Sequence, residues 1–177
     1  PGPESDIEIA RLMLTALASA GLRHLHLDLG HVGVFRALAA EAGLPEEIEG
    51  DLFEALQRKA RSQVEALLAR STAPAGIKAM LAALADLNGG AETLIQARAL
   101  LKGAPRAVQD ALENLESVAN GVMHLGAPVY FDLAELRGYR YYTGVVFSAF
   151  VPGQGQAVAQ GGRYDGIGRA FGRARSA

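Results

Sequence analysis

The first segment of the chain has apolar residues at every third or fourth position, the spacing of one face of an α-helix. These residues are Ile7, Ala10, Leu14 and Leu17. Ser5 and Glu8 stand at the spacing of a capping box, which predicts that the helix begins at Ser5. Gly21 predicts its end. We therefore expect the chain to open with an amphipathic helix.

The next segment alternates apolar and polar residues, the pattern of a half-buried β-strand. Leucines occupy one side and polar residues the other: Leu25, Leu27 and Leu29 against His24, His26 and Asp28. We expect a strand that buries its leucines and leaves its polar side at the surface or in a cleft.

Residues 31–120 are rich in Ala, Leu and Glu and are divided by residues that end helices. These breaks are Gly43 with Pro45, Pro74, Asn88–Gly89–Gly90, and Gly103 with Pro105. Between the breaks, apolar residues recur at helical spacing. The pattern predicts roughly five or six short helices that pack into a small all-α subdomain.

After Gly121 the composition changes to Gly, Tyr, Val and Phe, which favours strands and tight turns. Residues 129–133 alternate, and Tyr141–Val151 is a long β-branched and aromatic run. The turn residues Pro152–Gly155 then predict a hairpin that returns over Ala157–Gln160. The predicted fold class is α+β, with sheet strands separated by a helical insertion. Because helices and strands come in runs, a doubly wound parallel sheet is not expected.

The amino-acid composition excludes several classes of protein. The 177 residues are 50% hydrophobic and 20% charged, which excludes a chain that is disordered throughout. A net charge of -2 argues against a dedicated nucleic-acid binder, and the absence of cysteine excludes disulfide and thiolate sites. With neither a membrane helix nor a signal peptide in the sequence, we expect a soluble, cytoplasmic protein.

A metal site is the first candidate for chemistry. His24, His26, Asp28 and His31 lie on or just after the polar side of the predicted strand. Imidazoles and a carboxylate at this spacing can converge on a metal ion. A solvated or cleft-lining side of an antiparallel sheet explains the spacing about as well, so we predict no metal.

Two glycine-flanked segments are the other candidates. Arg137–Gly144 gathers arginines and tyrosines at the start of a predicted strand, and arginine can bind a carboxylate or phosphate. Gly161–Gly166 is a glycine-rich turn whose backbone could approach a ligand closely. The alternatives are a packed aromatic strand with outward arginines and an ordinary turn before a basic end with Arg169, Arg173 and Arg175.

Together these two segments resemble the histidine-specific motifs of the histidyl-tRNA synthetase family. They read Arg-Gly-Tyr-Arg-Tyr-Tyr-Thr-Gly-Val-Val-Phe and Gly-Gly-Arg-Tyr-Asp-Gly. The resemblance implies a class II aminoacyl-tRNA synthetase-like core, an antiparallel sheet flanked by helices, with a helical insertion. Residues 1–35 and 121–177 would belong to that core and residues 36–120 to the insertion. The family's other motifs are missing here, so we expect a fragment of a longer chain.

One departure separates two branches of this family. Synthetases carry an acidic residue after Arg-Gly-Leu, whereas this chain has Tyr139 and Arg140 at the corresponding positions. A guanidinium there would repel the ammonium of an amino-acid substrate. The chain is more similar to the non-catalytic branch, the regulatory subunits of ATP phosphoribosyltransferase, over Leu27–Arg36, Leu136–Phe150 and Ile167–Arg175.

The resemblance to this branch implies a regulatory subunit that is not itself an enzyme and needs no cofactor. It would assemble with the short-form catalytic subunit of ATP phosphoribosyltransferase, be required for the first step of histidine biosynthesis, and take part in feedback inhibition by histidine. A homodimer within a hetero-oligomer is expected. The alternatives are the catalytic-core fragment of a histidyl-tRNA synthetase, an ATP-dependent ligase, and an unrelated α+β binding domain whose tyrosines are merely core.

The resemblance also implies histidine-binding residues: Arg137, Tyr141, Tyr142, Tyr164, Gly161 and Gly162. Arg137 falls on the arginine that contacts the histidine carboxylate and the adenylate phosphate in the synthetases. Tyr141 and Tyr142 fall on pocket tyrosines, and Tyr164 on a tyrosine near the imidazole. Gly161 and Gly162 would allow their turn to approach the ligand closely.

Overall fold

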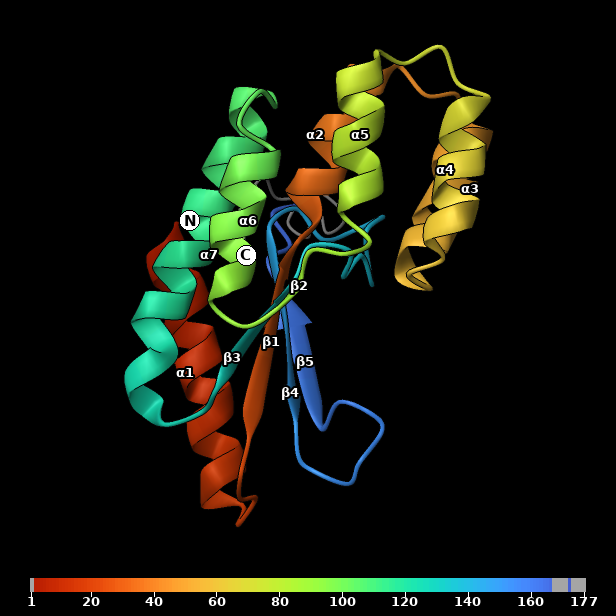
Figure 1. The fold of residues 1–177 in the computed structure, drawn as a ribbon. Coiled ribbons are helices and arrows are strands. Elements are labelled where there is room, and N and C mark those ends of the chain that lie inside the picture. Colours follow the sequence, from red (N-terminus) through yellow and green to blue (C-terminus); the bar gives the residue numbers. More distant parts are fainter. Residues whose placement is uncertain (1, 167–171, 173–177) are drawn as a thin grey trace.

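The computed structural model describes residues 2–166 and 172, and folds them into helices around a five-stranded sheet (Figure 1). The helices are α1 (Pro3–Ser19), α2 (Val32–Ala42), α3 (Glu46–Gln57), α4 (Arg61–Ala69), α5 (Ala75–Ala83), α6 (Glu92–Leu100) and α7 (Arg106–Val122), followed by the 3-10 helix η1 (Met123–Leu125). The strands are β1 (His26–His31), β2 (Asn88–Gly89), β3 (Val129–Asp132), β4 (Val145–Phe150) and β5 (Ala159–Gly162). None of the described helices has the length and hydropathy needed to cross a membrane.

The sheet has the order β2-β3-β1-β4-β5, which puts β1 in the centre. β1 is antiparallel to β4 but parallel to β3, and the β2–β3 and β4–β5 pairs are antiparallel. The predicted antiparallel sheet therefore needs one correction, at the β1–β3 pair. Parallel neighbours require a crossover connection, and the helices α2 to α7 provide it.

The two faces of the sheet differ in chemistry. Leu27 and Leu29 of β1 are fully buried and belong to the hydrophobic core that α1 and α7 help to form. The opposite face, which we call the open face, carries polar side chains in register across the strands: His26 and Asp28, Tyr130, Ser148 and Gln160. Figure 1 shows α1 and α7 on one side of the sheet and the α3–α4 pair on the other side. The alternation predicted for β1 is confirmed.

The first helix is confirmed, but its predicted start is wrong. α1 begins at Pro3, with Gly2 as N-cap and without a side-chain cap. Proline at the first turn of a helix has no amide that needs a partner, and its φ angle already suits the helix. Ser5 and Glu8 therefore lie inside the helix, where the capping-box spacing has no role.

The strand predicted over Tyr141–Val151 is too long, because β4 begins only at Val145. Gly138 has a positive φ of 69°, and its carbonyl accepts hydrogen bonds from the amides of Tyr141 and Tyr142. These local bonds turn the chain despite the strand propensity of its aromatic residues. The hairpin of β4 and β5 is confirmed.

The helical block is confirmed as the helices α2 to α7, with the short strand β2 as an addition. The predicted domain boundaries at residues 36 and 120 fall inside α2 and α7. Both helices contribute to the same core as the sheet, through Phe35, Leu112 and other residues. The division into core and insertion stays a prediction. The predicted basic end, with Arg169, Arg173 and Arg175, lies outside the described residues.

A buried ion pair ties the end of β5 to the first helix. Both carboxylate oxygens of Asp6 accept hydrogen bonds from Arg163, at 3.2 Å from Nε and 2.5 Å from Nη2. The side chains are only 7% and 18% exposed. A carboxylate left alone at such a site would be costly, so each partner depends on the other.

We predict that Arg163→Ala or Asp6→Ala lowers the free energy of unfolding by about 3 kcal/mol, since each leaves a buried charge without its partner. Denaturant unfolding of both variants checks this. Glu116→Gln is the matched control, because the Arg98–Glu116 pair is 38% and 51% exposed and should contribute below about 1 kcal/mol. Equal losses in all variants would contradict the prediction.

Candidate functional site

The two glycine-flanked segments predicted to form a site lie side by side in the structure. The amide of Thr143 donates to the carbonyl of Arg163, and the amide of Arg163 donates to the carbonyl of Val145. The Thr143 hydroxyl donates to Asp165 at 2.8 Å and accepts from the Asp165 amide at 3.0 Å. The turn before β4 is thereby fixed to the turn after β5.

The predicted tyrosines form one aromatic group. The ring centroids of Tyr141 and Tyr142 are 4.3 Å apart, and those of Tyr141 and Tyr164 are 5.3 Å apart in an edge-to-face arrangement. Burial and the neighbouring Tyr141 hydroxyl raise the pKa of Tyr142 to about 12. Tyr142 is therefore a neutral hydrogen-bonding phenol at physiological pH. Tyr141 is 48% exposed, so the group is open to solvent.

A row of small residues supports Tyr142. Gly30, Val146 and Gly162 are aligned across β1, β4 and β5 on the open face. A Cβ on Gly162 would lie 3.0 Å from the Tyr142 ring, and one on Gly30 would lie 2.9 Å from the Cβ of Glu135. The missing side chains thus make room for Tyr142 at one end of the row and Glu135 at the other. We call these aligned residues the glycine row.

Gly161 lies on the opposite face from Gly162. A Cβ there would meet the ring of Phe147 at 2.9 Å, on the core side of the sheet. Of the predicted pair of glycines, Gly162 therefore borders the tyrosines, whereas Gly161 allows close packing behind them. Neighbouring residues of a strand point to opposite faces, so the sequence alone could have separated their roles.

Arg137 lies at the Glu135 end of the glycine row, where that carboxylate holds it. Its Nε lies 3.0 Å from both carboxylate oxygens of Glu135 and its Nη2 lies 2.6 Å from one of them. Burial alone would raise the pKa of Glu135, but hydrogen bonds from Arg137 outweigh it and lower that pKa. The Glu135 side chain is 15% exposed and that of Arg137 is 51% exposed. The guanidinium therefore keeps an accessible side on which an anion could bind.

Sequence reasoning missed the residue that holds the tyrosine-bearing turn. The Nη2 atom of Arg36, on α2, donates to the backbone carbonyls of Tyr139 and Tyr142 at 2.7 and 3.0 Å. Its guanidinium also lies 4.9 Å from the centroid of the Tyr139 ring. No sequence motif signals this contact, because the partners are far apart along the chain and the acceptors are backbone atoms.

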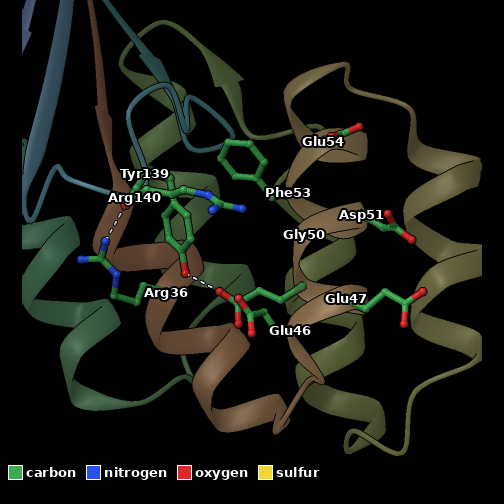
Figure 2. A pocket seen from close by; sticks show the side chains of 10 residues that line it. Arg36, Glu46, Glu47, Gly50, Asp51, Phe53, Glu54, Tyr139 and Arg140 are labelled. Atoms are coloured by element: carbon green, nitrogen blue, oxygen red, sulfur yellow. Dashed lines mark hydrogen bonds between the residues drawn. The ribbon is translucent and has the colours of Figure 1, made fainter.

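Tyr139 connects this turn to α3 (Figure 2). Its hydroxyl donates to Glu49 at 2.6 Å, and its ring packs against Phe35 and Phe53. Burial, together with the bond to Glu49, raises the pKa of Tyr139 to about 12. A phenol that stays neutral keeps its proton for that hydrogen bond, so Tyr139 serves as an anchor.

Arg140, the residue that departs from the synthetase pattern, lines a cavity of about 810 Å³ against α3. Carboxylates and aromatic rings share this cavity with it: Glu46, Glu47, Glu49, Asp51, Glu54, Phe53 and Tyr139. Figure 2 shows the guanidinium of Arg140 beside Phe53, on the α3 side of the turn. The Arg140 guanidinium therefore shares this cavity with the acidic residues of α3.

The four residues weighed as metal ligands do not all serve one site. His26 stacks on Phe150 at 5.4 Å, whereas His31 caps α2 by accepting from the amide of Gly33 at 3.0 Å. Over residues 2–166 and 172, no group of three or more His, Cys, Asp or Glu side chains is placed to hold a metal ion.

Comparison with known proteins places this arrangement in a family. The model of the histidyl-tRNA synthetase family matches residues 1–177. The chain belongs to this family. It is 56% identical over 179 residues to the ATP phosphoribosyltransferase regulatory subunit of Pseudomonas aeruginosa (strain LESB58), and 54% identical over 178 residues to that of Chromohalobacter salexigens. These alignments cover 100% and 99% of this chain but 45% of each relative, so the chain spans less than half their length.

Solved structures confirm the predicted class II synthetase-like fold. The ATP phosphoribosyltransferase regulatory subunit/histidyl-tRNA synthetase from Bacillus halodurans matches with a TM-score of 0.85 and 29% identity, over 99% of this chain and 46% of that one. The histidyl-tRNA synthetase from Nostoc sp. PCC 7120 matches with a TM-score of 0.78 and 18% identity, over 98% of this chain and 43% of that one. At that identity the second likeness concerns the fold alone.

The lowered pKa of His31 makes the stability of the protein depend on pH. Burial, and then the positive charges of Arg163 and Arg36, lower the pKa of His31 from 6.5 to about 4. The unfolded chain therefore takes up the proton first as the pH falls. The contribution of His31 to stability is complete above its unfolded pKa and is lost as the pH falls toward 4.

We predict that stability falls by up to about 1.4 kcal/mol per pH unit through this window, and that His31→Asn removes this part of the slope while keeping a side-chain cap. Urea unfolding at a series of pH values measures it. His24→Asn, at an exposed position, is the control. An unchanged slope in His31→Asn would show that other groups cause the pH dependence.

Proposed function

We propose that the chain is part of a regulatory subunit of ATP phosphoribosyltransferase, required for the first step of histidine biosynthesis and not itself catalytic. The observation that carries this proposal is the 54–56% identity, along essentially the whole chain, to relatives of that name. The catalytic short-form ATP phosphoribosyltransferase would be its partner. A structural neighbour from Thermotoga maritima, named as an ATP phosphoribosyl transferase (HisG:HisZ) complex, has the same fold at a TM-score of 0.70.

Histidine is the proposed effector, and the tyrosine-bearing turns are its proposed site. Three features support this. Arg137 keeps an exposed side for a carboxylate. The glycine row lets the Tyr142 ring lie close against β5. The aromatic group of Tyr141, Tyr142 and Tyr164 offers faces and hydroxyls to an imidazole. Gly161 acts indirectly here, by letting β5 pack closely on Phe147.

The position of Arg140 supports a binding role over an amino-acid-activating one. A synthetase needs a negative group to attract the ammonium of its substrate, and Arg140 supplies the opposite charge. Its guanidinium lies in the cavity with the acidic residues of α3, so it need not repel a ligand at the tyrosines. A pocket that only senses histidine can tolerate such a change more easily than one that must align the amino acid for reaction with ATP.

The alternative, a catalytic-core fragment of a histidyl-tRNA synthetase, rests on the shared fold and family.

Effector regulation requires that histidine bind one state of the complex more tightly than the other. The proposed homodimer within a hetero-oligomer would provide interfaces through which such states differ.

We predict that the full-length protein shows no histidine-dependent pyrophosphate exchange, and that adding it to the purified catalytic subunit produces histidine-sensitive ATP phosphoribosyltransferase activity. Steady-state assays with and without histidine measure the second effect. The catalytic subunit alone is the control. Pyrophosphate exchange above background would favour the synthetase alternative, and activity independent of the added protein would contradict a regulatory role.

We predict that Arg137→Ala weakens histidine binding by about 1.5–3 kcal/mol, roughly 10- to 150-fold, the usual contribution of a charge-assisted hydrogen bond. Glu135→Gln should bind histidine at least as tightly as the unchanged protein, because it removes the carboxylate that competes for Arg137. Calorimetry on the full-length protein measures both, with Arg98→Ala as a control arginine away from the turn. Unchanged affinity in Arg137→Ala would remove this residue from the site.

A further inference from the structure

A separate cavity of about 750 Å³ lies on the open face of the sheet, near the turn between α3 and α4. Its side-chain lining includes His24, His26, Asp28, Lys59, Tyr130 and Asp132. We call it the open-face cavity. The lining residues come from β1, β2, β3, the α3–α4 turn and the loops beside these strands, and none of them is an arginine or tyrosine of the proposed histidine site.

Asp28 is the one carboxylate in this lining without a partner among the described residues. Asp132 is neutralised by Lys59, whose Nζ lies 2.7 Å from each of its carboxylate oxygens. Over residues 2–166 and 172, no hydrogen bond or ion pair to Asp28 is formed. The Asp28 side chain is half-buried in the middle of the open face, so it presents acceptor oxygens to the cavity.

The charges around Asp28 make it a site for a cation. Burial raises the pKa of Asp28 most, and the carboxylates of Asp132 and Glu135 raise it further, while His26 and Arg137 act in the opposite sense. A bound cation would compensate the burial of this charge, since Asp28 lacks a partner of its own among the described residues. An anion would be repelled by the Asp28 carboxylate itself.

Aromatic rings form the rest of the wall. The His26 ring stacks on Phe150, with an interplanar angle of 11°, and meets the Tyr130 ring edge-on at 5.8 Å. His26 is thereby held in place, while Tyr130 is 45% exposed at the cavity. A phenol face beside an accessible carboxylate suits an organic cation, which gains both an ion pair and a cation–π contact.

Asn88 adds a further acceptor. Its Nδ2 donates to the carbonyl of Ala85 at 3.2 Å, which orients the amide and leaves the Oδ1 atom for a donor. With the Lys59 ammonium already engaged by Asp132, the unengaged polar groups of the lining are mainly acceptors. A ligand with several N–H donors fits this set better than one with carboxylates or phosphates.

We propose that the open-face cavity binds a small organic cation, an amine or guanidine, with Asp28 as its counter-ion and Tyr130 as its aromatic wall. The ligand's N–H groups donate to the Asp28 carboxylate, and its positive charge lies against the phenol ring. The residues that line this cavity differ from those of the proposed histidine site, and its test does not depend on histidine regulation.

Agmatine, which carries a guanidinium and an ammonium, is the probe, and glutarate is an anion of similar length. Calorimetry on the full-length protein should detect agmatine binding and no glutarate binding. Asp28→Asn should weaken agmatine binding about tenfold or more, and Tyr130→Leu roughly two- to fivefold. Asp51→Asn, which removes a carboxylate on α3 outside this cavity, should leave it unchanged.

Thermal unfolding of each variant shows whether it is folded, and Asp28→Asn keeps the shape of the side chain. Agmatine affinity that is the same in Asp28→Asn as in the unchanged protein would overturn the proposal. So would equal binding of glutarate, or the absence of agmatine binding at millimolar concentration. Loss of agmatine binding with intact histidine binding in Asp28→Asn would support two separate sites.

Discussion

The arrangement of the candidate site depends on one guanidinium, that of Arg36. The turn that carries Tyr141 and Tyr142 is irregular, and its carbonyl groups cannot all be satisfied within the turn. Arg36 donates to the carbonyls of Tyr139 and Tyr142 and so fixes this turn to α2. Buried or half-buried carbonyls need such partners, and a charged donor makes stronger bonds than a neutral one. The tyrosines lie outside any regular element, but the bonds from Arg36 hold their turn against α2.

Other side-chain contacts also fix the two turns of the candidate site to the rest of the fold. Asp6 and Arg163 tie the turn after β5 to α1, and Thr143 ties the two turns to each other. Tyr139 anchors the first turn to α3 through Glu49. Side chains from the opening helix, the helical block and the last strands thus converge on one pair of turns. Such a site is pre-organised, and a ligand binding to it loses little free energy in ordering the protein.

Much of this fold could be predicted from the sequence, since the spacing of apolar residues is a local signal. The leucines of β1 and the breaks between the helices are examples. The failures have local causes too: Pro3 and Gly2 start α1 in place of the capping box, and Gly138 turns the chain where aromatic residues favour a strand. The resemblance pointed to Tyr141, Tyr142 and Tyr164, whose rings do lie together, but a histidine site there stays a prediction. The roles of Arg36 and Glu135 could not be predicted from the sequence, because they arise from contacts that exist only after folding.

The parallel pairing of β1 with β3 has a consequence for how the protein folds. Leu27 pairs with Val129, so the whole helical segment between them forms the loop that this pairing closes. Closing a long loop costs entropy that is recovered only when the distant strands join, and contacts of this kind slow folding. Folding of the helices α2 to α7 shortens the flexible part of that loop and so lowers this cost. Unravelling these helices would lengthen the flexible loop and delay strand pairing even where no residue of the tyrosine-bearing turns is altered.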